Sequence, residues 1–184
     1  YALYDGTLYS SDEGDLSGVE YEDVVNEYVT EQSTAKFTTN ARESYFVGAL
    51  ARLNNNYDQL SPRAKRVAEA FGLEPVCHNP FMNNVAQVVE IAHLLETAGD
   101  LVDEILETGL DPQSDYNRPA IDPEDGRGVG FVEAPRGLLI HDYTFEDGTC
   151  RRANSVIPTN QNHANIQADM EAMVPTVLDR SQDE

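Results

Sequence analysis

The chain has 184 residues, of which 40% are hydrophobic, and this suits one domain or one lobe of a larger subunit with a real core. Acidic residues outnumber basic ones by 33 to 12, and a formal net charge of -21 excludes nucleic acid as a partner because the surface repels phosphate. No apolar run approaches the roughly 20 residues that cross a bilayer, and the N-terminus lacks a signal segment, so we expect a cytoplasmic protein without membrane insertion.

The acid excess has three interpretations. Lysine occurs only at Lys36 and Lys65, and an acidic, lysine-poor composition favours a protein that stays soluble in high salt, where screening limits self-repulsion. An acidic docking face and a calcium-like cation site are the alternatives, although the acids lack the spacing of a calcium loop. The chain begins at Tyr1 without an initiator methionine, and we expect this boundary to be internal to a longer protein.

The N-terminal part predicts a hairpin, a short helix and a buried segment. Residues 1–9 flank Asp5-Gly6, a dipeptide that suits a tight hairpin turn, and a polar loop follows. Residues 21–29 have apolar positions spaced for one face of a short helix. Residues 34–44 are polar and expected to be irregular, whereas residues 45–54 are expected to be buried.

Two longer helices come next. Ser61-Pro62 favours a helix over residues 62–71, since serine accepts a bond from a free amide and proline suits the first turn, and Gly72 ends it. The longest helix begins at Asn79-Pro80 and ends at Gly109, and Gly99 in its interior predicts a break or a close helix crossing. Steps of three and four residues predict its core face: Val85, Val88, Ala92, Leu95, Val102 and Ile105.

The last third of the chain changes to strand periodicity. Residues 110–127 are rich in proline and acids and predict a surface loop. Strands are expected at 129–131, 138–145 and 150–157, with Asp147-Gly148 as a hairpin turn. A final amphipathic helix is predicted, with a kink or early stop at Pro175 and the following apolar face: Ile166, Met170, Met173 and Val177.

These elements define an α+β fold class with several helices, one of them long and amphipathic, and a small antiparallel sheet with hairpins. We expect a single interior domain over residues 1–184. Its parts are a hairpin and loop (1–20), a helical part (21–109), antiparallel strands (128–160) and a C-terminal helix (161–180).

The segment Pro135-Arg136-Gly137 is the strongest candidate for chemistry. It interrupts a strand-like run, and the bend directs the Arg136 guanidinium at whatever lies beside it. Spacing alone leaves open a structural role, in which Arg136 pairs with Glu133 or with a helix end.

The order of motifs after Gly130 resembles the large subunit of nickel-iron hydrogenases. That family has a Glu-Ala-Pro-Arg-Gly segment, a downstream histidine, a polar turn, and Pro-Thr before an asparagine. The matching residues are Glu133, Ala134, Pro135, Arg136, Gly137, His141, Gly148, Pro158, Thr159 and Asn162. The family holds its metal with two cysteine pairs near the subunit ends, whereas this chain has only Cys77 and Cys150, so we expect an interior fragment that lacks the ligands.

The resemblance implies that Pro135, Arg136, Pro158 and Thr159 line the pocket around an iron that carries cyanide and carbon monoxide. Arg136 and the Thr159 hydroxyl would donate to cyanide nitrogen, and Arg136 would act as the catalytic residue beside the open metal position. Without the cyanides, Arg136 is expected to be exposed or paired with Glu133.

The resemblance also implies cofactors and a partner. A nickel-iron centre is expected in the intact subunit, whose partner is the iron-sulfur small subunit of hydrogenase, while this fragment alone is expected to be inactive and free of cofactor. A structural magnesium on the backbone carbonyl of Ser155 is a further implied site. His141 is expected to order the sheet or the surroundings of a proton-transfer site.

Upstream segments extend the similarity. Residues 47–54 resemble a Val-Gly-x-Leu-Ala-Arg segment, and residues 84–90 resemble an Ala-Arg-x-x-Glu helix in which Gln87 replaces the usual arginine, a change expected to weaken an ion pair of Glu90. The short middle region and the Ile157-Pro158-Thr159 ending resemble the cytoplasmic branch that couples hydrogen to nicotinamide, deazaflavin or sulfur reduction. A metal-free quinone-site subunit of the respiratory complex I type and a non-catalytic acidic interaction domain remain the alternatives.

The remaining candidate ligands have structural interpretations. Glu90 and His93 have the spacing of a helical metal motif, but no second such helix is present. Cys77 and Cys150 are expected to be small buried side chains without a disulfide. The histidines lack the short spacing of a zinc site and are expected to be structural or on the surface: His78, His93, His141 and His163.

Overall fold

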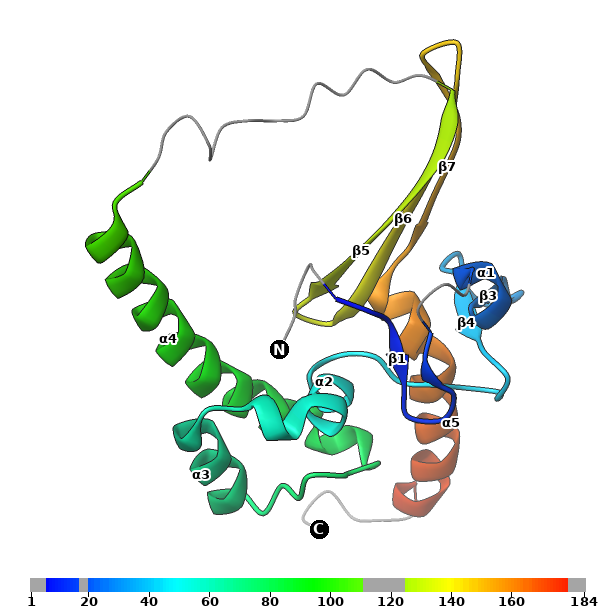
Figure 1. The fold of residues 1–184 in the computed structure, drawn as a ribbon. Coiled ribbons are helices and arrows are strands. Elements are labelled where there is room, and N and C mark those ends of the chain that lie inside the picture. The colour runs from blue at the N-terminus through cyan, green and yellow to red at the C-terminus, as the bar shows by residue number, and fades with distance from the viewer. Residues whose placement is uncertain (1–5, 17–19, 111–124, 179–184) are drawn as a thin grey trace.

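The computed structural model describes residues 6–16, 20–110 and 125–178, which form an α+β fold as predicted (Figure 1). The elements in chain order are β1 (Tyr9–Ser10), β2 (Gly14–Asp15), α1 (Tyr21–Val24), β3 (Asn26–Tyr28), β4 (Phe37–Thr39), α2 (Ala49–Asn56), the short 3-10 helix η1 (Tyr57–Gln59), α3 (Pro62–Ala70), the 3-10 helix η2 (Pro80–Met82), α4 (Asn83–Thr108), β5 (Gly126–Ala134), β6 (Gly137–Glu146), β7 (Thr149–Val156) and α5 (Pro158–Val177).

Helices α2, α3 and α4 form a helical body with its own core. The signals for α3 are confirmed, because the Ser61 side chain accepts a hydrogen bond from Ala64 N at 3.2 Å and Gly72 adopts a φ of 67° after the helix. The predicted burial of residues 45–54 is confirmed in α2. The fully buried residues of this core are Ala49, Leu50, Leu53, Leu60, Ala64, Ala68, Leu73, Ala86 and Val89.

Helix α4 follows η2, in which the Asn79 side chain accepts a hydrogen bond from Phe81 N, and its C-cap is Gly109 with a φ of 75°. Its predicted core face is confirmed only in part. Val85 and Ala92 pack partly buried against the core, whereas the other predicted residues are exposed: Val88, Leu95, Val102 and Ile105. The buried residues of the helix are Ala86, Val89, Glu90 and His93. The predicted break at Gly99 is wrong, because the helix runs through it and nothing lies within 4 Å of a Cβ placed there. Apolar side chains stay exposed along the helix: Val88, Ile91, Leu94, Leu95, Leu101, Val102, Ile105, Leu106 and, just past its end, Leu110.

Strands β5, β6 and β7 form a three-stranded antiparallel sheet in that order, which confirms the predicted strands. Asp147 and Gly148 have φ values of 49° and 66°, and they make the predicted turn between β6 and β7. Ala134 pairs with Gly137, so Pro135 and Arg136 form the turn between β5 and β6. Figure 1 shows this sheet diverging from α4, with the β5–β6 turn at its end nearer the helical body.

The N-terminal part contains the largest departures from prediction. The predicted helix over 21–29 ends at Val24, and Asn26–Tyr28 form a strand that pairs with Phe37–Thr39, a segment expected to be irregular. Contact with α5 stabilises this pair, since β4 packs on that helix. The first strand of the predicted 1–9 hairpin lies outside the described residues, and Tyr9–Ser10 pair with Gly14–Asp15 instead of leading into a loop.

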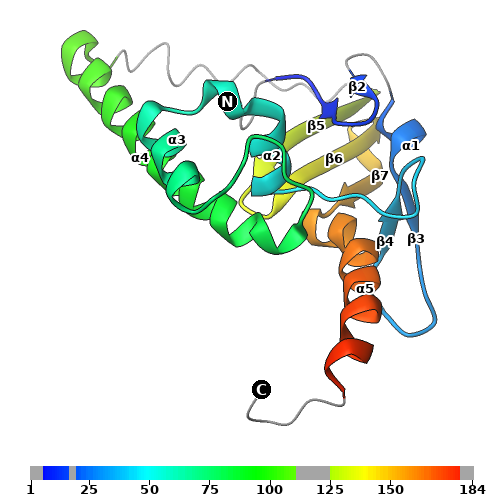
Figure 2. The ribbon, with the colours of Figure 1, turned by 90° about the horizontal axis from the view of Figure 1, so that it is seen from below.

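Helix α5 begins at Pro158, whereas the sequence pattern favoured a later start. Proline suits this first position because its missing N–H has no helical partner there. The helix contains Pro175 and ends two residues later, so the expected early stop is confirmed only approximately. Its predicted apolar face is not buried by the described residues, and Figure 2 shows the helix extending away from the sheet. No described helix meets the length and apolarity required to cross a membrane.

Candidate functional site

The turn between β5 and β6 packs directly on the backbone that leads into α2. Gly137 has a φ of 131°, and a Cβ there would lie 2.5 Å from Val47 Cγ2. Gly48 has a φ of 129°, and its Cβ would lie 3.2 Å from the carbonyl oxygen of Arg136. Both positions require glycine, because a side chain would meet strained backbone angles and occupied space. The two glycines therefore allow Val47-Gly48 and Arg136-Gly137 to contact each other without intervening side chains.

The start of α5 is hydrogen-bonded to the same place. Asn162 accepts from Val47 N at 2.8 Å and donates to Val47 O at 2.9 Å, so its amide binds the Val47 backbone as a neighbouring strand would. Gln161 donates to Leu138 O at 2.5 Å and accepts from Tyr45 Oη at 3.2 Å. Burial raises the pKa of Tyr45 to about 12, so this hydroxyl remains a donor. Three segments distant in sequence thus meet at one joint, formed by residues 45–48, 135–138 and 160–162.

Arg52 of α2 connects the helical body to the joint through hydrogen bonds. Its Nε and one terminal nitrogen donate to the two carboxylate oxygens of Glu90 at 2.7 and 2.8 Å. The other terminal nitrogen donates to Glu133 Oε2 at 2.6 Å and to Ala134 O at 3.0 Å, and the Glu90-bound nitrogen also donates to Pro135 O at 3.1 Å. All five N–H groups of the guanidinium are therefore used. We call Arg52, Glu90 and Glu133 the Arg52 cluster.

Arg52 and Glu90 are buried and Glu133 is half-buried, and this burial shifts the pKa values of Arg52 and Glu133. Burial alone would lower the pKa of Arg52, but the hydrogen bonds and charges of Glu90 and Glu133 raise it above its ordinary value. Burial raises the pKa of Glu133, an effect that the bond from Arg52 opposes. From the sequence, Arg52 was recognised only as part of a motif, and this role was missed. An arginine inside the apolar run of residues 47–53 was the available signal.

A second charged group joins the sheet to α1. We call Asp142, Arg127, Arg152 and Glu22 the Asp142 cluster. The buried Asp142 accepts from Arg127 at 2.9 Å through two nitrogens, from Arg152 at 2.7 Å and from Tyr21 Oη at 2.8 Å. Glu22 also receives bonds from both arginines. The bonds from Arg127 lower the pKa of Asp142 to about 2. This cluster fixes α1 on the sheet beside the small core of Tyr21, Ile140 and Val156.

The residues predicted for the site lie around the joint. Arg136 and Pro135 are exposed on the turn, Pro158 is buried as the first residue of α5, and Thr159 is exposed beside it. Arg136 is exposed, as expected for this chain, and the alternative pairing with Glu133 is wrong because Glu133 pairs with Arg52. Glu90 keeps a strong ion pair despite Gln87, since Arg52 supplies it. The hydrogen bonds of Val47, Leu138, Gln161 and Asn162 bring the two predicted bends together.

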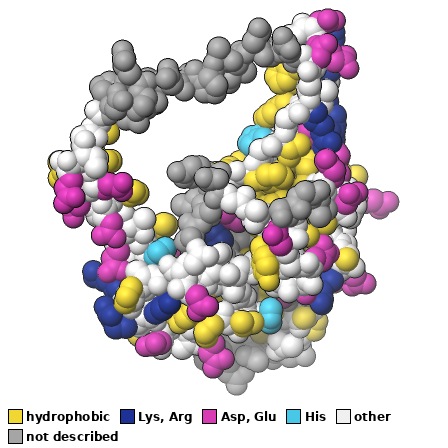
Figure 3. Space-filling view, in the orientation of Figure 1, with side chains coloured by type: hydrophobic (Ala, Val, Ile, Leu, Met, Phe, Trp, Pro, Cys, Tyr) yellow, Lys and Arg dark blue, Asp and Glu magenta, His cyan; other side chains and the backbone are white. Residues whose placement is uncertain are grey.

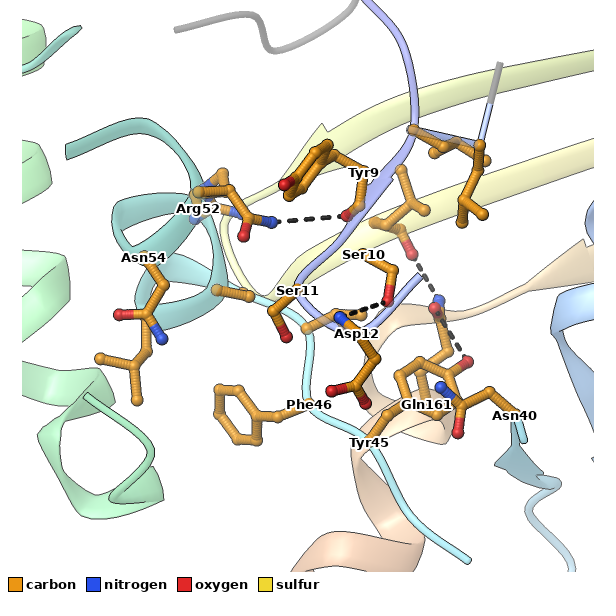
Figure 4. Close-up of a pocket in the computed structure, with 18 of the residues that line it drawn as sticks. Tyr9, Ser10, Ser11, Asp12, Asn40, Tyr45, Phe46, Arg52, Asn54 and Gln161 are labelled. Atoms are coloured by element: carbon orange, nitrogen blue, oxygen red, sulfur yellow. Dashed lines mark hydrogen bonds between the residues drawn. The ribbon is translucent and has the colours of Figure 1, made fainter. Parts of the chain in front are cut away.

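A cavity of about 850 Å³ lies beside the joint rather than at Pro135, Arg136, Pro158 and Thr159 (Figure 4). The β1–β2 hairpin, the segment 44–48, α2 and the sheet surround it, and Figure 4 shows Asp12, Tyr45, Phe46 and Gln161 around the space. Arg52 and Glu133 lie in its wall, whereas Pro135, Arg136, Pro158 and Thr159 do not line it. The predicted residues therefore lie outside the lining of this cavity.

Other candidate ligands have structural roles. His93 accepts from Ser61 N at 3.2 Å, and His141 Nδ1 lies 2.7 Å from Tyr143 Oη and 3.3 Å from Ser155 Oγ. Cys77 and Cys150 are free thiols as expected, but Cys150 is exposed rather than buried. Within the described ranges, no group of three or more His, Cys, Asp or Glu could hold a metal ion. Figure 3 shows acidic side chains at many places on the visible surface.

Comparison with known proteins defines the class to which this fold and joint belong. Residues 12–174 match the family model described as nickel-dependent hydrogenase, and the chain belongs to this family. It is 34% identical to the alpha chain of sulfhydrogenase 1 from Pyrococcus furiosus, over 94% of this chain and 40% of the relative. It is 31% identical to the vhu F420-non-reducing hydrogenase of Methanococcus voltae, over 83% of this chain and 37% of the relative.

A solved structure supports the same family. The chain superimposes on an NAD+-reducing [NiFe]-hydrogenase in the H2-reduced state with a TM-score of 0.69 and 27% identity, covering 91% of this chain and 39% of that one. The chain thus spans about two fifths of the length of the relatives it matches. The family resemblance seen in the sequence is confirmed.

Proposed function

We propose that this chain is the part of a nickel-iron hydrogenase large subunit that supplies pocket residues beside the metal centre, for the reversible oxidation of dihydrogen to protons and electrons. One observation carries the proposal. The joint binds the turn containing Pro135 and Arg136 to the helix start containing Pro158 and Thr159, through glycine contacts and hydrogen bonds to Val47 and Leu138.

The donors at this joint fit a metal group that carries cyanide. Arg136 presents an exposed guanidinium, which can only donate hydrogen bonds, and Thr159 presents an exposed hydroxyl. The N-cap of α5, Ile157, makes no side-chain capping bond, and the first turn holds no acidic residue, so the positive end of the helix dipole is not neutralised by its own side chains. Donors and positive potential are what a cyanide nitrogen requires.

The nickel-iron centre, when bound, supplies the heterolytic cleavage of dihydrogen, and its direct ligands would come from outside the described residues. Arg136 would contribute a positive charge beside the reacting position. Pro135 and Pro158 present carbon and no N–H donor, which keeps water away from the pocket wall. Thr159 orients the bound group by donating its hydroxyl hydrogen.

The relatives support finer assignments within this proposal. Their names include sulfhydrogenase, F420-non-reducing hydrogenase and NAD+-reducing hydrogenase, and these agree with the cytoplasmic, cofactor-coupled branch. In this proposal the partner is an iron-sulfur small subunit and the location is the cytoplasm. Magnesium on the Ser155 carbonyl and adaptation to high salt, drawn from the net charge of -21, belong to the same proposal.

Metal analysis with hydrogen-dependent dye reduction tests the function. The protein purified with its natural partners should contain nickel and iron and reduce a dye under hydrogen. Arg136→Lys should lower turnover on the order of 100-fold, because lysine lacks the planar fork of donors, while both metals stay bound.

The matched control is Arg151→Lys, an exposed arginine whose contact with Glu146 is 3.7 Å long. It should leave turnover unchanged. A protein without nickel, as expected of a quinone-site subunit, contradicts the proposal. Activity lost by Arg136→Lys only in step with metal loss contradicts the direct role of Arg136.

A further inference from the structure

We propose that Arg52 is the positioning residue that fixes the Pro135–Arg136 turn, and with it the Arg136 side chain, relative to helices α2 and α4. The part of this inference that concerns catalysis rests on the proposed function. The part that concerns the turn rests only on the geometry of the Arg52 cluster.

The hydrogen bonds of Arg52 end on the backbone just before Arg136. Ala134 O and Pro135 O accept from its two terminal nitrogens at 3.0 and 3.1 Å. The Pro135 carbonyl belongs to the peptide group that begins Arg136, and this group is planar. A bond to its oxygen therefore fixes the plane from which the Arg136 residue extends.

Glu90 fixes the orientation of the Arg52 guanidinium. Both of its carboxylate oxygens bind the same side of the Arg52 fork, at 2.7 and 2.8 Å, which leaves the remaining N–H groups pointing at Glu133 and the two carbonyls. A bidentate pair of this kind fixes orientation as well as distance. The position of α4 therefore determines, through Glu90 and Arg52, where the turn lies.

Lysine cannot reproduce this arrangement. Its ammonium has three donors on a flexible stem, against five in the rigid arginine fork, so it cannot bind Glu90 at two points and still reach Glu133 and both carbonyls. Steric contact at Gly48 and Gly137 limits how closely the turn approaches α2. The Arg52 bonds oppose the reverse movement, in which Ala134 and Pro135 would separate from the helices.

Hydrogen-deuterium exchange read by mass spectrometry tests the proposal on the protein assembled with its natural partners. Arg52→Lys should raise exchange about 10-fold in a peptide spanning residues 134–139, through local opening, and leave the β7 peptide (Thr149–Val156) unchanged. Hydrogen turnover should fall while nickel and iron are retained.

Two further variants separate bonding from charge. Glu133→Gln keeps an oxygen acceptor for Arg52 and should change turn exchange by less than about 2-fold. Arg42→Lys, an exposed arginine paired with Asp12 at 2.6 Å, should change neither exchange nor turnover. If Arg52→Lys does not accumulate, Glu90→Gln weakens the orientation of the fork and should raise exchange at 134–139 selectively.

Two results overturn the inference: unchanged turn exchange in both Arg52→Lys and Glu90→Gln, or exchange that rises equally throughout the chain, which would make Arg52 a residue of general stability. A wild-type protein without nickel and hydrogen turnover would refute the proposed function alone. The exchange measurements would still decide the role of Arg52 at the turn.

Discussion

The Arg52 and Asp142 clusters are opposite in charge and differ in how they meet solvent. One guanidinium lies between two carboxylates in the first, and one carboxylate lies between two guanidinium groups in the second. The Arg52 side chain is 6% exposed. The Asp142 side chain is 1% exposed, but its partners Arg127 and Arg152 are 33% and 46% exposed. The loss in free energy of unfolding when the central charge is removed should therefore depend on whether the remaining partners can be solvated by water.

The largest expected effect follows from removing the centre of the buried cluster. Arg52→Ala leaves Glu90 and Glu133 without their cation, and the Glu90 side chain is only 9% exposed. The free energy of unfolding should fall by about 3–5 kcal/mol, the usual cost of breaking a buried pair by removing one partner. Urea unfolding of the purified protein measures this, with Arg42→Ala as the exposed control. A loss no larger than that of the control would mean that the two carboxylates find other partners.

A smaller loss is expected at the Asp142 cluster. Asp142→Asn removes the charge, but Arg127 and Arg152 are partly in solvent and keep Glu22 as a partner. The variant should cost about 1–3 kcal/mol, the range for a buried polar group that loses charged hydrogen bonds. Asp103→Asn on the exposed surface of α4 is the control. If Asp142→Asn costs more than Arg52→Ala, solvent access does not explain the comparison.

The pH dependence of the two clusters should have opposite signs. The pKa of Asp142 is lowered from 3.8 to about 2, so its stabilisation is present above pH 3.8 and is lost as pH falls towards 2. The difference between wild type and Asp142→Asn should therefore shrink over this window.

Glu133 behaves in reverse, because burial raises its pKa above 4.5 and folding favours its protonated form. Glu133→Gln should be at least as stable as wild type at pH 7, and the two proteins should converge as pH falls below 4.5. Thermal unfolding across pH measures both windows. Parallel curves for all three proteins would contradict the assigned shifts.

The smallest effect is expected outside both clusters, in the middle of α4. Gly99→Ala should stabilise by about 0.5–1 kcal/mol, because alanine favours the helix and nothing lies within 4 Å of the new Cβ. Gly137→Ala is the contrasting glycine change and should destabilise, since its Cβ would meet Val47. Thermal unfolding distinguishes the signs, and destabilisation by Gly99→Ala would show a contact on α4 that the described residues do not supply.

Local signals predicted much of the fold. The caps of α3 and the Asp147-Gly148 turn were correct because neighbouring residues determine them. The core face of α4 was only partly correct, because the helix carries apolar residues on several sides and only its packing on α2 and α3 selects the buried side. The β3–β4 pair was missed because contact with α5 stabilises a segment whose own pattern is polar.

The candidate site also has a part that the sequence predicted and a part that only the fold reveals. The Pro135-Arg136 bend was evident from sequence, and the family resemblance joined it to Pro158-Thr159. Arg52 was missed because its partners Glu90 and Glu133 lie 38 and 81 residues away in the chain, and no local pattern links them. Burial of an arginine becomes visible only when the fold brings its acceptors together.

Full use of the Arg52 donors has an evolutionary consequence. With every N–H engaged, a substitution at position 52 or 90 leaves the other residue without its two-point partner, so changes at these two positions should be strongly non-additive in double-mutant cycles. Across related sequences, positions 52 and 90 should covary as a pair, either retained as arginine and acid or replaced together by neutral residues, whereas position 133 should accept an acid or an amide.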